Sequence, residues 1–152
     1  MARGSGSVNR PILLSPGARR AYALWVESIT FIDGGWKPGN TPVMGAEDYA
    51  LWLGSIVFDG ARAFEGVTPD LDLHCARLIA SAQAFGLQSM LSAGEVMELA
   101  LDGVAKFPRG SELYIRPLLF AAEGKGHLSP DPDSTRFALT IFTAPLPAPS
   151  GF

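Results

Sequence analysis

The chain has 152 residues, of which 47% are apolar, 18% charged and 10% aromatic; this composition indicates one compact domain and excludes a disordered, collagen-like or coiled-coil chain. Its formal net charge of −3 gives no electrostatic reason to expect a nucleic acid or an anionic membrane as a partner. The single cysteine, Cys75, excludes an internal disulfide, and no apolar run is long enough to span a bilayer, so we expect a cytoplasmic protein.

The two ends of the chain differ in composition from the middle. Residues 1–20 are rich in Gly, Ser, Pro and Arg, which predicts a flexible arm. Residues 144–152 contain three alternating prolines, Pro145, Pro147 and Pro149, a pattern typical of an extended linker. We therefore expect a small domain over residues 21–143, followed by the start of an interdomain linker whose second domain is absent from this sequence.

Strand signals dominate the first half of that domain. The aromatic and β-branched residues of 22–31 predict a strand, and the turn Asp33-Gly34-Gly35 predicts a hairpin into a second strand at Trp36. Residues 46–53 fit a short helix, and residues 55–64 read as a further strand that contains Gly60.

Two helices and two strands follow. Apolar residues recur at helical spacing over 73–85, with Asp72 able to cap the start. Ser92 and Glu95 form a capping box for a second helix, which Pro108 stops. Residues 113–120 and 136–143 predict strands, and Pro117 favours an edge or a bulge for the first of them. This order predicts an α+β fold, a largely antiparallel sheet with two helices packed on one face.

Arginines are the candidate functional residues. Arg77 lies three residues after His74 on one face of the first helix, where a guanidinium either binds phosphate or is simply solvated. Arg116 lies two residues after Tyr114, so strand alternation places both on one face. There Arg116 either pairs with a carboxylate, Asp59 or Glu65, or faces a cavity for an anionic ligand. Arg62 is open to both interpretations, and no ligand pair has metal-site spacing.

Three segments carry a family resemblance: VFDGARAF at residues 57–64, HCARL at 74–78 and YIRPL at 114–118. In order and spacing they are similar to the branched-chain amino acid aminotransferases, pyridoxal-phosphate enzymes of fold type IV. The resemblance covers about residues 25–145 and corresponds to the small N-terminal domain of those two-domain enzymes. Asp59 stands where the family often has glutamate, and Leu53 where many members have tyrosine.

The resemblance implies a role for each matching residue. Arg77 matches the arginine that holds the phosphate of pyridoxal 5'-phosphate, and Tyr114 and Arg116 match residues that meet the second carboxylate of glutamate or 2-oxoglutarate. Phe58 matches a phenylalanine that lines the pocket for the aliphatic side chain, and Arg62 an arginine beside that pocket.

The resemblance also implies what the sequence lacks. The family's Schiff-base lysine lies in its second domain, and none of Lys37, Lys106 and Lys125 matches it. The glutamate that pairs with the pyridine nitrogen belongs to that domain as well. We therefore expect no catalytic residue in this chain, and no activity from the chain alone.

The expected function is transfer of an amino group between Leu, Ile or Val and 2-oxoglutarate by a homodimeric full-length enzyme. Its partners would be small-molecule amino acids and 2-oxo acids, without a metal. An aminodeoxychorismate lyase or a D-amino acid aminotransferase shares the scaffold and is an alternative. A non-catalytic domain that binds an anion or a protein partner is the alternative from a different class.

Overall fold

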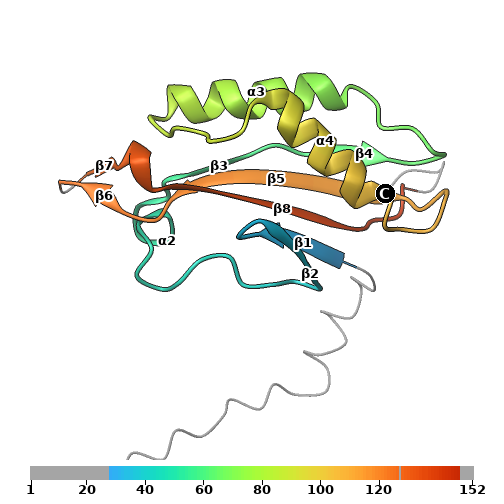
Figure 1. Cartoon of the computed structure of the whole chain (residues 1–152), viewed down its shortest axis with the longest axis horizontal. Coiled ribbons are helices and arrows are strands. Elements are labelled where there is room, and N and C mark those ends of the chain that lie inside the picture. The colour runs from blue at the N-terminus through green and yellow to red at the C-terminus, as the bar shows by residue number, and fades with distance from the viewer. Residues whose placement is uncertain (1–27, 127, 148–152) are drawn as a thin grey trace, which may run out of the picture.

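The structure, a computed structural model, describes residues 28–126 and 128–147 (Figure 1). The predicted N-terminal arm, the first part of the predicted strand over 22–31 and the end of the predicted linker lie outside the described residues. The architecture is α+β, with a sheet covered on one face by two helices, as the sequence predicts (Figure 1).

The main sheet has six strands, and every neighbouring pair is antiparallel. Its order is β2-β1-β8-β5-β3, and a further strand, β4, also pairs with β5. The two central strands, β5 and β8, are nine residues long each. The strands are β1 (Ser28–Ile32), β2 (Gly35–Pro38), β3 (Ile56–Phe58), β4 (Ala61–Ala63), β5 (Leu113–Ala121) and β8 (Thr135–Thr143).

The segment between β5 and β8 contains short elements. A two-stranded sheet forms from β6 (Gly124–Lys125) and β7 (Ser129–Pro130), and the 3-10 helix η1 (Pro132–Ser134) follows.

Three α-helices are present among the described residues, α2 (Tyr49–Leu53), α3 (Leu71–Ala84) and α4 (Ala93–Val104). The predicted capping box of α4 is confirmed, because Glu95 N–H donates to Ser92 Oγ and Ser92 N–H donates to Glu95 Oε2. The predicted cap of α3 is wrong: Asp70 occupies the N-cap position, and Asp72 lies within the first turn. Helix α4 ends at Val104, before the predicted stop at Pro108.

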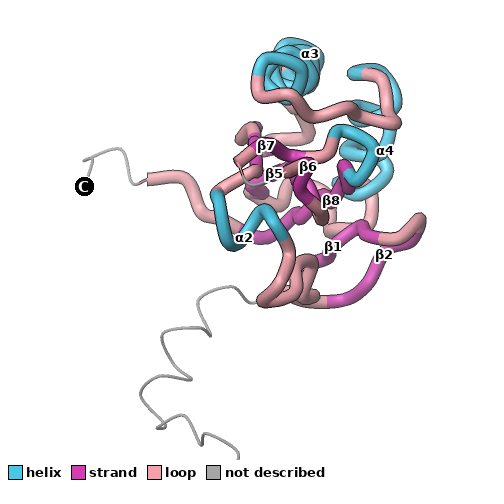
Figure 2. The backbone as a smooth tube through the Cα atoms, turned by 90° about the vertical axis from the view of Figure 1, so that its left-hand side faces the viewer, coloured by secondary structure: helices cyan, strands magenta, loops and turns pink. Residues whose placement is uncertain are grey.

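Both faces of the sheet carry apolar clusters, but of different size. The larger cluster lies beneath α3 and α4 and includes Leu78, Val96, Ile115, Leu119 and Ile141. Figure 2 shows these two helices on the same side of the strands. On the opposite face, which we call the open face, a smaller cluster contains Ile32, Ala50, Leu118, Phe120 and Ala138.

Pro117 lies in the middle of the sheet, so the predicted edge or bulge is wrong. It belongs to β5, which pairs with β8 on one side and with β3 and β4 on the other. The predicted strand over 55–64 is divided into β3 and β4 at Asp59 and Gly60, opposite Pro117. Asp59 N–H donates to the Pro117 carbonyl at 3.2 Å, and the N–H that proline lacks falls at this interruption. A central strand therefore accommodates the proline.

None of the helices in the described ranges has the length and hydropathy that a membrane span requires.

Candidate functional site

Asp59 and Gly60 link β3 to β4. The side chains of Asp59 and of the residue before it, Phe58, project to opposite faces of the sheet. Phe58 pairs with Leu118 and belongs to the open face, where 62% of it is exposed. Asp59 follows on the helix-covered face and is only 7% exposed. Side chains alternate across a strand, so the consecutive residues Phe58 and Asp59 carry groups for opposite faces.

The carboxylate of Asp59 binds the guanidinium of Arg77 on α3 through two hydrogen bonds. Arg77 Nε donates to Asp59 Oδ2 at 2.7 Å, and Arg77 Nη2 donates to Oδ1 at 2.8 Å. The Arg77 side chain is 62% exposed, and its Nη1 has no hydrogen-bond partner among the described residues. The pairing uses one edge of the guanidinium and leaves the Nη1–Nη2 edge available to a second anion.

His74, one helical turn before Arg77, completes the cluster. Its Nδ1 lies 2.8 Å from Asp59 Oδ1 and 2.9 Å from Arg77 Nη2. A bare Nδ1 would place two acceptors against each other at the Asp59 contact, whereas Nδ1–H donates to the carboxylate. We therefore assign the proton to Nδ1, so that the approach of Arg77 Nη2 to Nδ1 is a contact between two donors and not a hydrogen bond.

These contacts change the ionisation of the pair. Burial alone would raise the pKa of the Asp59 carboxyl, but donors from Arg77, His74 and the Gly60 N–H outweigh it and hold that pKa below its ordinary value. The hydrogen bonds to Asp59 in turn raise the pKa of Arg77. Both groups are ionised over the physiological range.

Arg62 and Tyr114 lie side by side on the open face, as a register pair between β4 and β5. The Tyr114 ring lies 5.3 Å from that of Phe142, centroid to centroid, and a Cβ placed at Gly60 would overlap the Tyr114 hydroxyl. Arg62 Nη2 donates to the Ala144 carbonyl, while the buried Arg62 Nε has no partner among the described residues. Such an orphaned donor is costly unless a ligand or another chain segment supplies an acceptor.

Arg116 follows Tyr114 on the same face and is exposed. The predicted alternative, an ion pair with Asp59 or Glu65, is not observed. Asp59 is on the other face with Arg77, and Arg116 makes no ion pair within the described part of the chain.

The structure thus separates the five predicted site residues into two groups. The open face carries Phe58, Arg62, Tyr114 and Arg116. The helix-covered face carries Arg77, together with Asp59 and His74. Sequence reasoning missed Asp59 and His74 as partners of Arg77. The spacing of His74 and Arg77 indicates that the two side chains lie on one helix face. It does not identify Asp59 as the carboxylate that binds them.

The lysines lie elsewhere in the fold. Each of the three is paired with an aspartate, Lys37 with Asp33, Lys106 with Asp102 and Lys125 with Asp131.

Among the described residues there is no cluster of His, Cys, Asp and Glu side chains suited to a metal ion.

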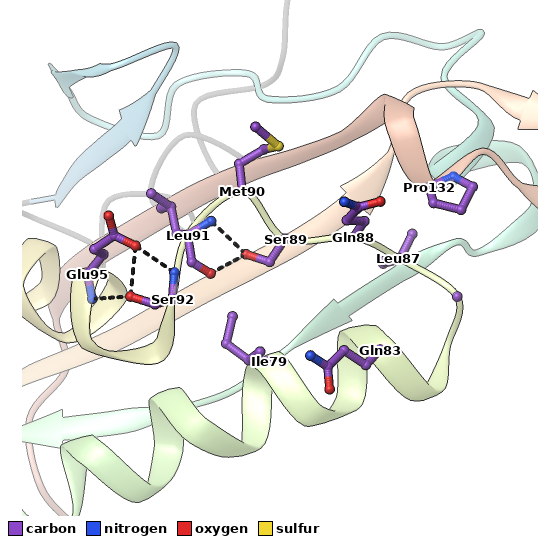
Figure 3. Close-up of a pocket in the computed structure, with 11 residues that line it drawn as sticks. Ile79, Gln83, Leu87, Gln88, Ser89, Met90, Leu91, Ser92, Glu95 and Pro132 are labelled. Carbon is purple, nitrogen blue, oxygen red and sulfur yellow. Dashed lines mark hydrogen bonds between the residues drawn. The ribbon is translucent and has the colours of Figure 1, made fainter.

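A groove of about 680 Å³ lies apart from these residues, between α3 and the segment that leads into α4 (Figure 3). Ile79 and Gln83 line it from α3, Met90 and Leu91 from the connecting segment, and Pro132 from η1. Internal hydrogen bonds hold the connecting segment, from Ser89 to Leu91 and between Ser92 and Glu95. The groove includes none of the predicted site residues.

Solved structures of other proteins define the class of this fold. An aminotransferase from Brucella abortus, solved bound to the co-factor PLP, superposes with a TM-score of 0.80 and 46% sequence identity, over 83% of this chain and 45% of that chain. The branched-chain amino acid aminotransferase of Escherichia coli superposes with a TM-score of 0.69 over 78% of this chain and 41% of its own, and its 24% identity supports the fold alone. The fold is that of the class IV aminotransferases.

Sequence comparison assigns the family. Residues 56–151 match the family model described as amino-transferase class IV, and the chain belongs to this family. A probable branched-chain-amino-acid aminotransferase of Rickettsia conorii is 36% identical over 75 residues, which are 49% of this chain and 26% of that protein. A putative one of Methanocaldococcus jannaschii is 32% identical over 102 residues, 67% of this chain and 34% of that protein. The chain spans about a quarter to a third of the length of these relatives.

Proposed function

We propose that the full-length protein is a pyridoxal 5'-phosphate-dependent aminotransferase that exchanges amino groups between branched-chain amino acids and 2-oxoglutarate. The observation that carries this proposal is Arg77, a bidentately held guanidinium with its outer edge open to solvent. Family membership and the PLP-bound Brucella abortus relative support it. The names of the Rickettsia conorii and Methanocaldococcus jannaschii relatives favour branched-chain substrates.

The residues present fit a phosphorylated cofactor. Arg77 offers paired N–H donors on its free edge, which match two phosphate oxygens, and Asp59 already neutralises the opposite edge. When bound, pyridoxal 5'-phosphate supplies an electron sink for the reacting amino acid. In this proposal the chain's own contribution is to hold the phosphate at Arg77 and so to orient the cofactor.

The open face would select the substrates. In this proposal the two arginines of the open face offer cationic donors to a dicarboxylate: Arg62, whose Nε has no partner among the described residues, and the exposed Arg116. Tyr114 is the register partner of Arg62 on the same face. Phe58 offers an exposed apolar ring for an aliphatic side chain. These roles are the ones that the family resemblance implies.

The covalent chemistry would come from outside these 152 residues. In this proposal none of the three lysines of the chain carries the cofactor, and the pairing of each with an aspartate supports this. We propose that a second domain of the full-length protein supplies the lysine, that the active protein is a cytoplasmic homodimer, and that the present chain alone is inactive. We further propose the boundaries above, a small domain over 21–143 followed by linker.

The test is a substrate panel on the natural full-length protein. Leucine with 2-oxoglutarate should yield glutamate, whereas D-alanine and aminodeoxychorismate should be turned over poorly. Glutamate formation is the readout, and its absence with leucine would rule out the branched-chain assignment. Turnover of D-alanine or aminodeoxychorismate instead would assign the protein to one of the alternatives that share the scaffold.

A variant links the substrate to the open face. Arg116→Gln should raise the KM for 2-oxoglutarate by about tenfold or more, because a charge-assisted hydrogen bond is lost, and should raise the KM for leucine less. Arg109→Gln is the matched control, since Arg109 is exposed in the turn after α4. Equal effects of the Arg116 variant on both substrates would contradict dicarboxylate recognition.

A further inference from the structure

We propose that Asp59 is a positioning residue, which fixes the Arg77 guanidinium so that its Nη1–Nη2 edge meets the phosphate of the cofactor. His74 and the Gly60 N–H hold Asp59 in turn. The inference deepens the proposed function and rests on it, because it assumes that Arg77 receives the phosphate. It adds two residues to the site that the family resemblance does not assign.

The geometry forms a chain of supports from the backbone outward. Gly60 N–H donates to Asp59 Oδ1 at 2.7 Å, and His74 Nδ1 approaches the same oxygen at 2.8 Å. The carboxylate, with a side-chain exposure of 6%, is therefore fixed by the strand link and by α3. Asp59 then engages both Nε and Nη2 of Arg77, which sets the plane of the guanidinium.

Arg77 needs this support because it is exposed. A free arginine side chain samples many rotamers, and ordering it on binding lowers the affinity for a ligand. Two hydrogen bonds to a fixed carboxylate remove most of that freedom before the phosphate arrives. The donors that remain point away from Asp59, so the two anions use different edges of one cation.

A simpler account predicts the opposite result. If Asp59 only competes with the phosphate for the charge of Arg77, removing the carboxylate leaves a stronger cation and tightens phosphate binding. If Asp59 positions Arg77, removing the carboxylate frees the side chain and weakens binding. The sign of the change therefore distinguishes the two accounts.

The experiment compares two probes by equilibrium dialysis against the natural full-length protein, pyridoxal 5'-phosphate and pyridoxal, which lacks the phosphate. Asp59→Asn should weaken binding of the phosphorylated probe by about tenfold, because Arg77 loses a charge-assisted hydrogen bond that positions it. The affinity for pyridoxal should stay unchanged. Asp59→Glu, which keeps the charge, should recover part of the loss. Asp33→Asn is the matched control, because Asp33 pairs with another arginine, Arg136, away from the site.

Arg77→Gln separates this inference from the proposed function. If that variant leaves the affinity for pyridoxal 5'-phosphate unchanged, the phosphate role of Arg77 fails, and the positioning role fails with it. If Arg77→Gln weakens binding but Asp59→Asn does not, or tightens it, the positioning role alone is overturned. Equal weakening of both probes by Asp59→Asn would also overturn it, because a merely structural residue acts on both.

A measurement on the unmodified protein covers the case in which Asp59→Asn does not fold. The Nε–H of Arg77 should exchange with solvent at least about tenfold more slowly in NMR spectra than that of the exposed Arg109, because Asp59 binds it. Equal exchange rates would mean that the guanidinium is not held, and would overturn the proposal.

Discussion

An ionised carboxylate with little exposure is stable at residue 59 because donors from three places converge on it. The Gly60 N–H, the His74 ring and the Arg77 guanidinium replace the water that burial removes. The sequence predicts Arg77 as an anion-binding residue. It does not predict the pairing with Asp59, because 18 residues separate the two and the contact exists only once α3 lies over the end of β3.

This cluster predicts a pH dependence of stability. The folded-state pKa of Asp59 is lowered, so its contribution is fully present above the unfolded pKa of about 3.9 and is lost as the pH falls through the folded pKa. Asp59→Asn should lower the free energy of unfolding by roughly 1 kcal/mol at pH 7, discounted for the exposure of Arg77. Urea unfolding of both proteins should show this difference shrinking below about pH 4. A difference that persists unchanged at acidic pH would contradict the ion pair.

Cys75 should be unreactive in the folded protein. It is buried, and burial, with a contribution from Asp59 and Asp72, raises the pKa of its thiol to about 11. Reaction with a thiol reagent at pH 8 should be at least about 100-fold slower than in the denatured chain, because the thiolate is scarce and covered. As the only cysteine, it gives a direct readout. Fast reaction under native conditions would contradict its burial.

Among the elements, helix ends and strand breaks show where local signals suffice. The capping box of α4 involves residues three apart, so the sequence predicts it correctly. The sequence wrongly predicts an edge or a bulge at Pro117, because the sequence of one strand does not show which strands pair with it. Only the pairing of β5 with the interrupted strands β3 and β4 shows where a missing N–H is tolerated.

Two glycines of α4 should respond oppositely to alanine. A Cβ at Gly103 would overlap Trp36 and Ile141, whereas one at Gly94 would meet only Ser92 Oγ at 4.0 Å. Gly103→Ala should lower the free energy of unfolding by about 1 kcal/mol, since overpacking of about 1–3 kcal/mol exceeds the gain in helix propensity. Gly94→Ala should leave it unchanged or raise it by up to about 1 kcal/mol. Urea denaturation measures both, and equal effects would contradict close packing of α4 on the sheet.

At the scale of the whole molecule, β5 and β8 hold the sheet together. The hairpin of β1 and β2 joins on one side of this central pair, and β3 and β4 join on the other. Helices α3 and α4 cover the same central strands (Figure 1). We therefore expect the domain to unfold as one cooperative unit.

Leu119→Ala tests this cooperativity. Leu119 is 1% exposed in β5, and the cavity should lower the free energy of unfolding by about 2–5 kcal/mol. Helix circular dichroism and tryptophan fluorescence should shift together to a lower urea midpoint. Leu73→Ala is the matched control, because Leu73 is 60% exposed on α3 and its loss should cost less than about 0.5 kcal/mol. Separate transitions for the two probes would show that the sheet and helices unfold independently.

Local sequence patterns predict the α+β class, the shared face of Tyr114 and Arg116 and the family motifs, because periodicity, capping and short segments are local properties. Only the folded structure shows that β5 is central, that Asp59 binds Arg77, and that Arg62 joins Tyr114 and Arg116 on the face opposite to Arg77. These features depend on strand order and on the placement of α3. Both are set by burying one apolar core between distant segments, which no local pattern encodes.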